Sequence, residues 1–190
     1  IEDVYWHANG NPVFVSISVQ AIRKGDEVIG GVVNFSDISV RKLAEQAIKD
    51  SEAFKSSVLD AMPAHIAVLD RGGTIVEINE PWRRFSRENS ATPGDIPQNS
   101  QVGTNYLSVC QQSQGDFSAE APSAREGIQA VLDGRLESFY LEYPCHSVEE
   151  ERWFSMVVSP LKTAQQGAVV AHTNITERKR SEARSTLLEY

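Results

Sequence analysis

The stretch GGVVNFSDISVRK at residues 30–42 is matched by GAVVAHTNITERK at residues 167–179. In both copies an apolar run leads into a polar residue, an isoleucine and a hydroxyl residue, and a basic helix start follows. Each copy also comes after a strand that can pair with it as a hairpin. The repeat predicts that one structural module occurs twice in tandem, so these two stretches decide the fold.

The polar residues at the end of each repeat are placed to join a strand to a helix. An Asp or Asn there accepts hydrogen bonds from backbone N–H groups that have no partner within the helix. Asp37 can also pair with Arg41 across the first turn, whereas Asn174 can cap but cannot form an ion pair with Arg178. A rigid cap would convert movement of the sheet into movement of the helix. The candidate signal-relay residues are Asp37, Ser39, Arg41, Asn174, Thr176 and Arg178.

The residues around the first repeat form a hairpin. Residues 12–22 alternate apolar and polar side chains, a turn follows at residues 24–27, and residues 28–35 form the second strand. Two strands cannot make a stable core alone. We therefore expect residues 1–39 to be the closing strands of a domain that begins before Ile1.

Residues 40–62 are predicted to form a linker helix of about six turns. Its apolar side chains follow a three-four spacing that repeats every seven residues, with Ser51 filling one gap. The stripe fits two interpretations, a surface helix packed on its own domain or the seam of a parallel dimer. Its members are Val40, Ala44, Ala47, Phe54, Val58 and Ala61.

Residues 63–176 carry the elements of a complete domain. Asp70-Arg71-Gly72-Gly73 is a strong hairpin turn, Asn79 followed by Pro81 is typical of a helix start, and Gly134 is well placed to end a helix. The expected order is strands at 65–69 and 74–78, a short helix after Asn79, a loop at 90–102, a helical turn at 106–110, a helix at 119–132, strands at 139–146, 152–161 and 168–173, and a last helix at 177–190.

This order of elements resembles the PAS family. The Asp37-Ile38-Ser39-x-Arg41 junction, the turn at 102–106 and the hairpin joining 141–147 to 152–154 resemble PAS domains of bacterial sensor proteins. The resemblance implies an α+β fold with an antiparallel five-stranded sheet and helices on one face. It also implies a domain order: an upstream PAS remnant at 1–39, a linker helix at 40–62, a complete PAS domain at 63–176, and an output-linking helix from 177.

In PAS domains the cavity lies between the sheet and the helices, so inward side chains are the pocket candidates. A domain of this size must also bury large apolar groups, and we expect most of these residues to be core. The candidates are Trp82, Phe85, Tyr106, Cys110, Ile128, Leu132, Leu141, Tyr143, Phe154, Met156, Val170 and His172.

The ligand is left open. Photoactive flavin PAS domains carry a reactive cysteine where Tyr106 stands here, so flavin photochemistry is not expected. Haem is an alternative, because His172 or His65 can supply an axial imidazole. A small apolar or mixed-polarity metabolite, or no ligand at all, is favoured over haem.

Several other functions are disfavoured. A net charge of −8 argues against nucleic-acid binding, and no apolar run approaches the roughly 20 residues that a membrane helix needs. Cys110 and Cys145 have no partners at metal-ligand spacing, which fits a reducing cytoplasm. No phosphate loop, nucleophile elbow or phosphoacceptor histidine is present, so we expect no enzyme here.

The sequence therefore predicts a sensory module that relays a ligand or partner signal through helical linkers. The output domain, a histidine kinase or a diguanylate cyclase, is expected beyond Tyr190. A homodimer held by the linker helices is expected as the assembly. The alternatives are a ligand-free dimerisation scaffold and a haem-based redox or gas sensor.

Overall fold

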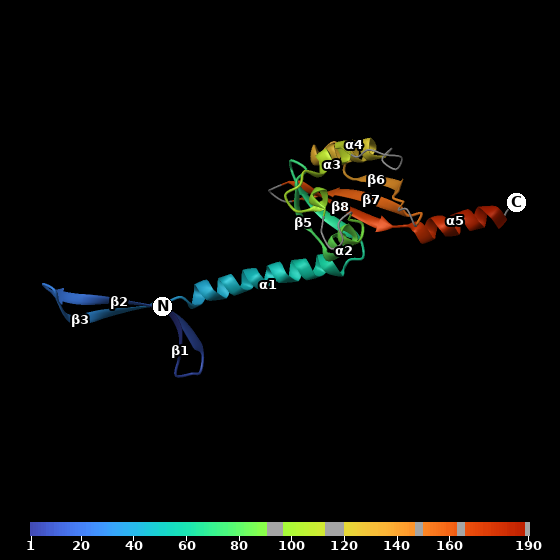
Figure 1. The fold of residues 1–190 in the computed structure, drawn as a ribbon. Coiled ribbons are helices and arrows are strands. Elements are labelled where there is room, and N and C mark those ends of the chain that lie inside the picture. Colours follow the sequence, from blue (N-terminus) through green and yellow to red (C-terminus); the bar gives the residue numbers. More distant parts are fainter. Residues whose placement is uncertain (91–96, 113–119, 147–149, 163–165, 189–190) are drawn as a thin grey trace. The chain divides into compact units, whose positions relative to one another are not determined.

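The computed structural model describes residues 1–90, 97–112, 120–146, 150–162 and 166–188 (Figure 1). The chain divides into two compact units, Ile1–Ser56 and Ser57–Tyr190. Helix α1 (Ser39–Ala61) begins in the first unit and ends in the second.

The first unit contains a three-stranded antiparallel sheet of order β1-β2-β3. The hairpin predicted from the sequence is present as β2 (Pro12–Lys24) and β3 (Glu27–Asp37). Strand β1 (Glu2–Trp6) was not predicted, because its residues do not alternate apolar with polar side chains. It is held by pairing with β2 rather than by its own pattern. Val15 is the one buried side chain among residues 1–56.

Helix α1 lies one residue earlier at each end than the predicted range 40–62, and none of its residues is buried. Val40 is 84% exposed and Phe54 is 71% exposed in the single chain. The apolar stripe thus faces outward along much of the helix.

The second unit contains the predicted five-stranded antiparallel sheet. Its strands are β4 (His65–Asp70), β5 (Ile75–Ile78), β6 (Phe139–Pro144), β7 (Trp153–Pro160) and β8 (Gly167–Asn174). Their order in space is β5-β4-β8-β7-β6. The last strand in sequence, β8, therefore lies at the centre of the sheet.

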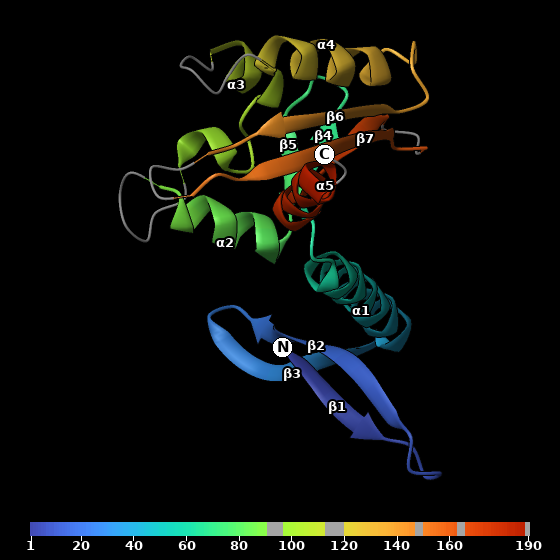
Figure 2. The same ribbon diagram turned by 90° about the vertical axis from the view of Figure 1, so that its right-hand side faces the viewer.

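Among the described residues, four helical segments lie between β5 and β6 in sequence, and one follows the sheet. They are α2 (Glu80–Glu88), the 3-10 turn η1 (Gln98–Ser100), α3 (Tyr106–Gln112), α4 (Ala121–Leu132) and α5 (Thr176–Leu188). Helix α4 packs on β6, β7 and β8, while α2 packs on β4 (Figure 2). The predicted start of the helix at 119–132 and the predicted end of the helix at 177–190 fall outside the described residues.

Gly134 ends α4 as predicted. Its φ of +73° is a left-handed conformation that favours glycine. Its N–H donates to the Val131 carbonyl at 3.0 Å, and the N–H of Arg135 donates to the Ala130 carbonyl at 2.8 Å. These two bonds form a Schellman motif, which satisfies carbonyls that the helix end would otherwise leave unpaired.

The core lies between the sheet and the helices. Val158, Val170 and Ala67 are neighbours across β7, β8 and β4, and all three are fully buried. From the helix side, Ile128 and Val131 of α4 close the same core. The cavities lie beside this core, against the residues of β6, β7 and β8 nearer the start of α5.

Candidate functional site

Two cavities lie side by side under the sheet. The first has a volume of about 180 Å³ and lies between α3, α4 and the strands β6, β7 and β8. The second has a volume of about 200 Å³ and adjoins α2 and η1. Both are lined by Tyr106, Val109, Tyr143 and His172, so these four residues form a wall shared by the two cavities.

Three polar side chains in this wall form a hydrogen-bonded triad. The hydroxyl of Tyr106 lies 3.1 Å from Nε2 of His172, and the hydroxyl of Tyr143 lies 2.7 Å from Nδ1 of the same ring. The three residues come from α3, β6 and β8, and His172 is 6% exposed. The triad therefore joins the helical layer to the centre and the edge of the sheet.

The start of α3 is positioned by the hairpin turn between β4 and β5. The N–H of Tyr106 donates to the carbonyl of Gly73 at 2.8 Å. Gly73 has a φ of +79°, and a Cβ on it would approach the Leu107 side chain to 2.6 Å. The glycine thus allows the turn to lie against α3, which sets the position of the Tyr106 ring.

The histidine, tyrosine and cysteine side chains that line the first cavity are uncharged at neutral pH. Burial and the neighbouring His65 lower the pKa of His172 to about 3. Burial also raises the pKa of the Tyr106 and Tyr143 hydroxyls far above their usual value, and raises the pKa of the Cys110 thiol to about 11. A neutral imidazole and protonated hydroxyl and thiol groups therefore face the cavities.

Aromatic rings surround the second cavity. The rings of His65 and Phe85 stack with centroids 4.6 Å apart. Trp82 lies 5.6 Å from the His172 ring, and its indole N–H donates to the Ser100 carbonyl at 3.0 Å. The hydrogen bond fixes the polar atom of the Trp82 indole against backbone, with its ring tilted by 54° to that of His172.

The structure places most of the predicted pocket residues at the cavities. Ile128 and Val170 are instead fully buried in the core, and Leu132 packs against that core. For the predicted residues that do line the cavities, contact with a ligand stays a prediction. The predicted residues that line one or both cavities are Trp82, Phe85, Tyr106, Cys110, Leu141, Tyr143, Phe154, Met156 and His172.

Several lining residues were not predicted. Val109 lies three residues after Tyr106 on α3, so helical spacing from that predicted residue could have found it. Ala121 and Ala124 begin α4, where their small side chains leave space. The others carry no sequence signal that separates them from surface residues: Glu120, Ser86, Asn99 and Ser100.

His172 is not placed to serve as an axial ligand of haem. Both ring nitrogens of His172 already face tyrosine hydroxyls. An axial ligand needs a ring nitrogen with a free lone pair. Within the described ranges, no three His, Cys, Asp or Glu side chains come together in a way that could hold a metal ion.

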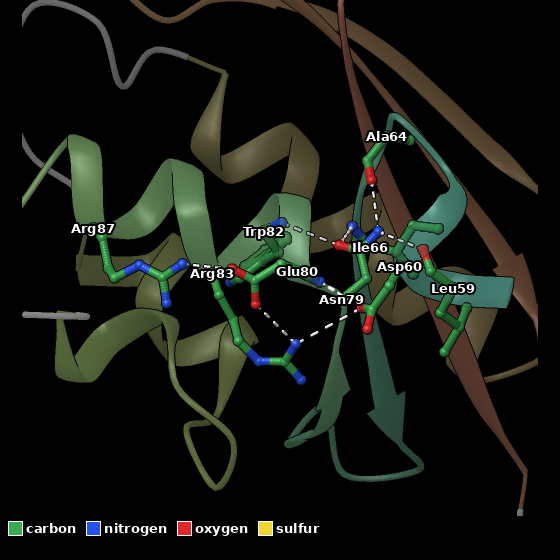
Figure 3. A network of polar contacts seen from close by, with 9 residues as sticks. All are labelled: Leu59, Asp60, Ala64, Ile66, Asn79, Glu80, Trp82, Arg83 and Arg87. Carbon is green, nitrogen blue, oxygen red and sulfur yellow. Dashed lines mark hydrogen bonds and ion pairs between the residues drawn. The ribbon is translucent and has the colours of Figure 1, made fainter. Parts of the chain in front are cut away.

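Asn79 is the polar centre of the junction between the last turn of α1 and the sheet (Figure 3). Its amide oxygen accepts the N–H groups of Ile66 at 2.9 Å and Trp82 at 3.1 Å. Its amide nitrogen donates to the carbonyls of Leu59 at 3.0 Å and Ala64 at 2.8 Å. The sequence predicted the helix cap, but this 1% exposed side chain also ties α1 to β4 and α2.

Charged side chains surround this upstream junction (Figure 3). The N–H of Glu80 donates to the Asp60 carboxylate at 2.7 Å, and Arg83 lies 3.8 Å from the same carboxylate. Arg87 pairs with Glu80 at 2.5 Å and lowers the pKa of that carboxyl. The end of α1 and the start of α2 are thus joined by a backbone hydrogen bond to Asp60 and by an ion pair to the same residue.

The downstream junction fixes β7 and β8 to α5. The amide oxygen of Asn174 accepts the N–H of Thr176 at 3.0 Å, as a cap does. The hydroxyl of Thr176 accepts the N–H of Trp153 at 3.0 Å, and the Trp153 carbonyl accepts the N–H of Ile175 at 2.8 Å. The hydroxyl residue therefore bonds to the neighbouring strand rather than to its own helix.

The first unit repeats this geometry bond for bond. The carboxylate of Asp37 accepts the N–H of Ser39 at 2.8 Å, and the Ser39 hydroxyl accepts the N–H of Phe14 at 3.0 Å. The Phe14 carbonyl accepts the N–H of Ile38 at 2.8 Å. The strand register is also shared, since Val15 faces Asp37 as Phe154 faces Asn174.

The predicted ion pair between Asp37 and Arg41 was wrong. Arg41 pairs with Glu2 at 2.5 Å and with Glu45 at 2.9 Å. The carboxylate of Asp37 instead accepts a hydrogen bond from the backbone N–H of Ser39. That backbone bond lowers the pKa of Asp37.

The arginine of the second junction is paired as well, although Asn174 carries no charge. Arg178 pairs with Glu142 and with Glu182, both at 2.6 Å. We expected only the first junction to have an ion-paired arginine, because Asn174 carries no charge. Both Arg41 and Arg178 are instead paired with two glutamates each.

The family model described as the PAS fold matches residues 59–180, which is more than half of the chain. The chain belongs to the PAS-fold family. The match includes the last turn of α1, the cavities and the downstream junction of the PAS domain. Residues 1–58 lie outside the match, so their assignment to an upstream PAS domain stays a prediction.

One relative is an uncharacterised 104.1 kDa protein from the hypE 3′ region of Rhodobacter capsulatus. It is 38% identical over 148 residues, which are 77% of this chain and 14% of that protein. This PAS chain therefore spans a small part of the relative that it matches.

Two solved structures share the fold. The PAS domain of BvgS from Bordetella pertussis is 15% identical, with a TM-score of 0.48, and the match covers 74% of this chain and 97% of that domain. The phage VqmA–DPO complex is 16% identical, with a TM-score of 0.46, over 78% of this chain and 62% of that one. Among the helices of the described ranges, none combines the length and the apolar character needed to span a bilayer.

Proposed function

We propose that this PAS domain is a sensory module that takes up a small molecule in the cavities beneath β6, β7 and β8. The observation that carries the proposal is the position of His172. Its ring forms the centre of the cavity wall, and Asn174, two residues further along β8, caps α5. A change at the ring would therefore act on the strand that begins the output helix.

Strand β7 offers a second connection between cavity and helix. Phe154 and Met156 line the cavities. The backbone of the adjacent Trp153 donates its N–H to the hydroxyl of Thr176 and accepts the N–H of Ile175 at its carbonyl. A ligand would favour one arrangement of these strands only as far as it binds that arrangement more tightly. The output is proposed to be a histidine kinase or a diguanylate cyclase further along the polypeptide.

The test is to identify what the protein carries. The purified chain is denatured, and the released small molecules are analysed by mass spectrometry. We expect one small organic molecule in an amount comparable to the protein. A protein that releases nothing, and whose thermal unfolding is shifted by none of a broad set of metabolites, would contradict a sensory role.

A second candidate function is a dimerisation scaffold without a ligand. The exposed apolar stripe of α1 favours it, because Val40 and Phe54 repeat at heptad spacing and are 84% and 71% exposed. Light scattering during size-exclusion chromatography tests it. A dimer that Phe54→Glu converts to a monomer supports a linker-helix seam, whereas an unaltered mass for the variant contradicts that seam.

A further inference from the structure

The hydrogen-bonding protons of the Tyr106–His172–Tyr143 triad can be counted. Neutral His172 carries one N–H proton, and each tyrosine carries one O–H proton, so the three side chains hold three such protons. Two hydrogen bonds link them, at 3.1 Å and 2.7 Å, and each bond uses one proton. One proton is therefore left without an acceptor inside the triad.

The leftover proton is a tyrosine O–H in either tautomer of the imidazole. If Nδ1 carries the proton, it donates to Tyr143, Tyr106 donates to Nε2, and the Tyr143 hydroxyl keeps a free proton. If Nε2 carries the proton, the free hydroxyl is that of Tyr106. Both rings line both cavities. In each case the wall offers one hydrogen-bond donor, which solvent can satisfy until a ligand's acceptor replaces it.

The same wall offers no charge to a bound ion. No Lys or Arg is among the described residues that line the cavities. Arg152 stacks over Phe85 at 5.5 Å but donates to the Cys145 carbonyl and to Asn89. The half-buried Glu120, at the edge of the first cavity, would repel an anion. Burying a charge without a partner is costly, so an anion is disfavoured in both cavities and a cation in the second, whose described lining has no carboxylate.

The volumes set the size of the ligand. Each cavity measures about 180 to 200 Å³. A protein cavity of about 150 Å³ lined by apolar side chains binds benzene. Each cavity therefore has room for one ring with a small substituent.

We infer that the cavity binds an uncharged, ring-sized molecule that presents a carbonyl or similar hydrogen-bond acceptor to the free tyrosine hydroxyl of the triad. This inference rests on the proposed sensory function and names the class of its ligand. The acceptor fixes the orientation of the molecule, and the aromatic and aliphatic lining contacts its apolar body. Binding consumes the one donor that the triad does not use itself.

Four molecules of matched size test the ligand class on the purified chain. Acetophenone carries an acceptor, ethylbenzene carries none, benzoate is an anion and benzylammonium is a cation. Affinities are measured by ligand-observed NMR and calorimetry at pH 7.5. We expect acetophenone to bind about tenfold more tightly than ethylbenzene, as one added hydrogen bond predicts, and more tightly than either ion.

The outcomes separate the ligand class from the sensory function. Equal binding of acetophenone and ethylbenzene, or tighter binding of benzoate or benzylammonium, would overturn the ligand class while leaving a cavity that binds small molecules. Binding of none of the four would overturn the ligand class, and the analysis of released small molecules would then decide the sensory function separately.

The proton count also predicts an unusual pattern among variants. Tyr106→Phe alone leaves two protons and one hydrogen bond, so one donor is still free and the preference for acetophenone should remain. Only the combined Tyr106→Phe, Tyr143→Phe and His172→Leu variant removes every donor of the triad, and its preference should fall to about one. Tyr140→Phe is the matched control, because that tyrosine is 57% exposed and lines neither cavity. Loss of the preference in the single variant would overturn the proton count.

Discussion

Glu142 on β6 and Arg178 on α5 form a 2.6 Å ion pair that joins the edge of the sheet to the helix that leaves it. Glu2 and Arg41 form the same pair at 2.5 Å in the first unit. Each glutamate also lies opposite a serine of the next strand and pairs with the lysine that follows the arginine. The tandem repeat thus includes a glutamate, Glu2 or Glu142, that lies far from the repeated stretch in sequence. We call the ion pairs of this glutamate with the arginine and lysine at the helix start the acidic clamp.

Replacement of Glu142 by Gln should loosen the start of α5. The partners are partly exposed, so the effect on global stability should be small. We expect faster hydrogen exchange at residues 176–180, measured by mass spectrometry. Glu182→Gln is the control, since it removes only the other carboxylate from Arg178. Equal exchange in the two variants would show that Glu142 does not act as a clamp.

The clamp should also open in acid. Lys179, Tyr140 and Arg178 lower the pKa of Glu142 to about 2, below its usual value of 4.5. Because the folded-state pKa is lowered, the clamp is fully present above about pH 4.5 and is lost as the pH falls toward about 2. NMR titration of the Glu142 carboxyl in the intact protein checks the value. A midpoint near 4.5 would mean that the ion pairs do not form in solution.

Thr176→Ala should destabilise the PAS domain by about 1–2 kcal/mol without unfolding it. The buried hydroxyl of Thr176 is the acceptor for the N–H of Trp153, and alanine leaves that N–H without its partner. Urea unfolding measures the change in the free energy of unfolding. Thr176→Ser keeps the hydroxyl and should recover most of the loss, so a serine variant as unstable as the alanine variant would count against this role.

Asn79→Ala should have a larger effect, about 2–4 kcal/mol. It removes four hydrogen bonds at one buried position, two to N–H groups and two to carbonyls. Urea unfolding of the variant is compared with that of Asn89→Ala, a change at the exposed end of α2. If both variants lose similar stability, the junction at Asn79 contributes no more than a surface cap.

The stability of the domain should rise with pH between about 3 and 6.5 because of His172. Its pKa is about 3 in the folded protein and 6.5 when unperturbed, so unfolding takes up a proton within that range. The expected slope for one proton is about 1.4 kcal/mol per pH unit. The lowered pKa of His65 acts in the same direction.

Urea unfolding at a series of pH values measures this slope. His172→Phe should reduce the slope by about 1.4 kcal/mol per pH unit, the contribution of one proton. An unaltered slope in His172→Phe would show that the ring is not held neutral by burial.

The order of elements could be predicted from the sequence because each one has a local signal. The turn at Asp70 to Gly73, the cap at Asn79 and the end of α4 at Gly134 follow from the chemistry of single residues. These signals were sufficient for the sheet and for most of the cavity wall.

What the sequence could not provide is the choice of partners between distant elements. Asp37 and Arg41 have suitable spacing for an ion pair, yet Glu2 on another strand offers Arg41 a better one. Likewise Tyr106 and Tyr143 were predicted only as pocket residues, because nothing in their spacing shows that both reach His172. Such contacts depend on the register of the strands and on the exact approach of α3.

The central claim is that the cavity and the start of α5 are linked through β7 and β8. Hydrogen exchange of the purified chain, measured with and without saturating acetophenone, tests it most directly. We predict changed protection at residues 175–179, including the N–H of Lys179 that donates to Ile175 at 3.0 Å, together with protection at the cavity strands. Protection at the cavity strands with no change at residues 175–179 would contradict the account.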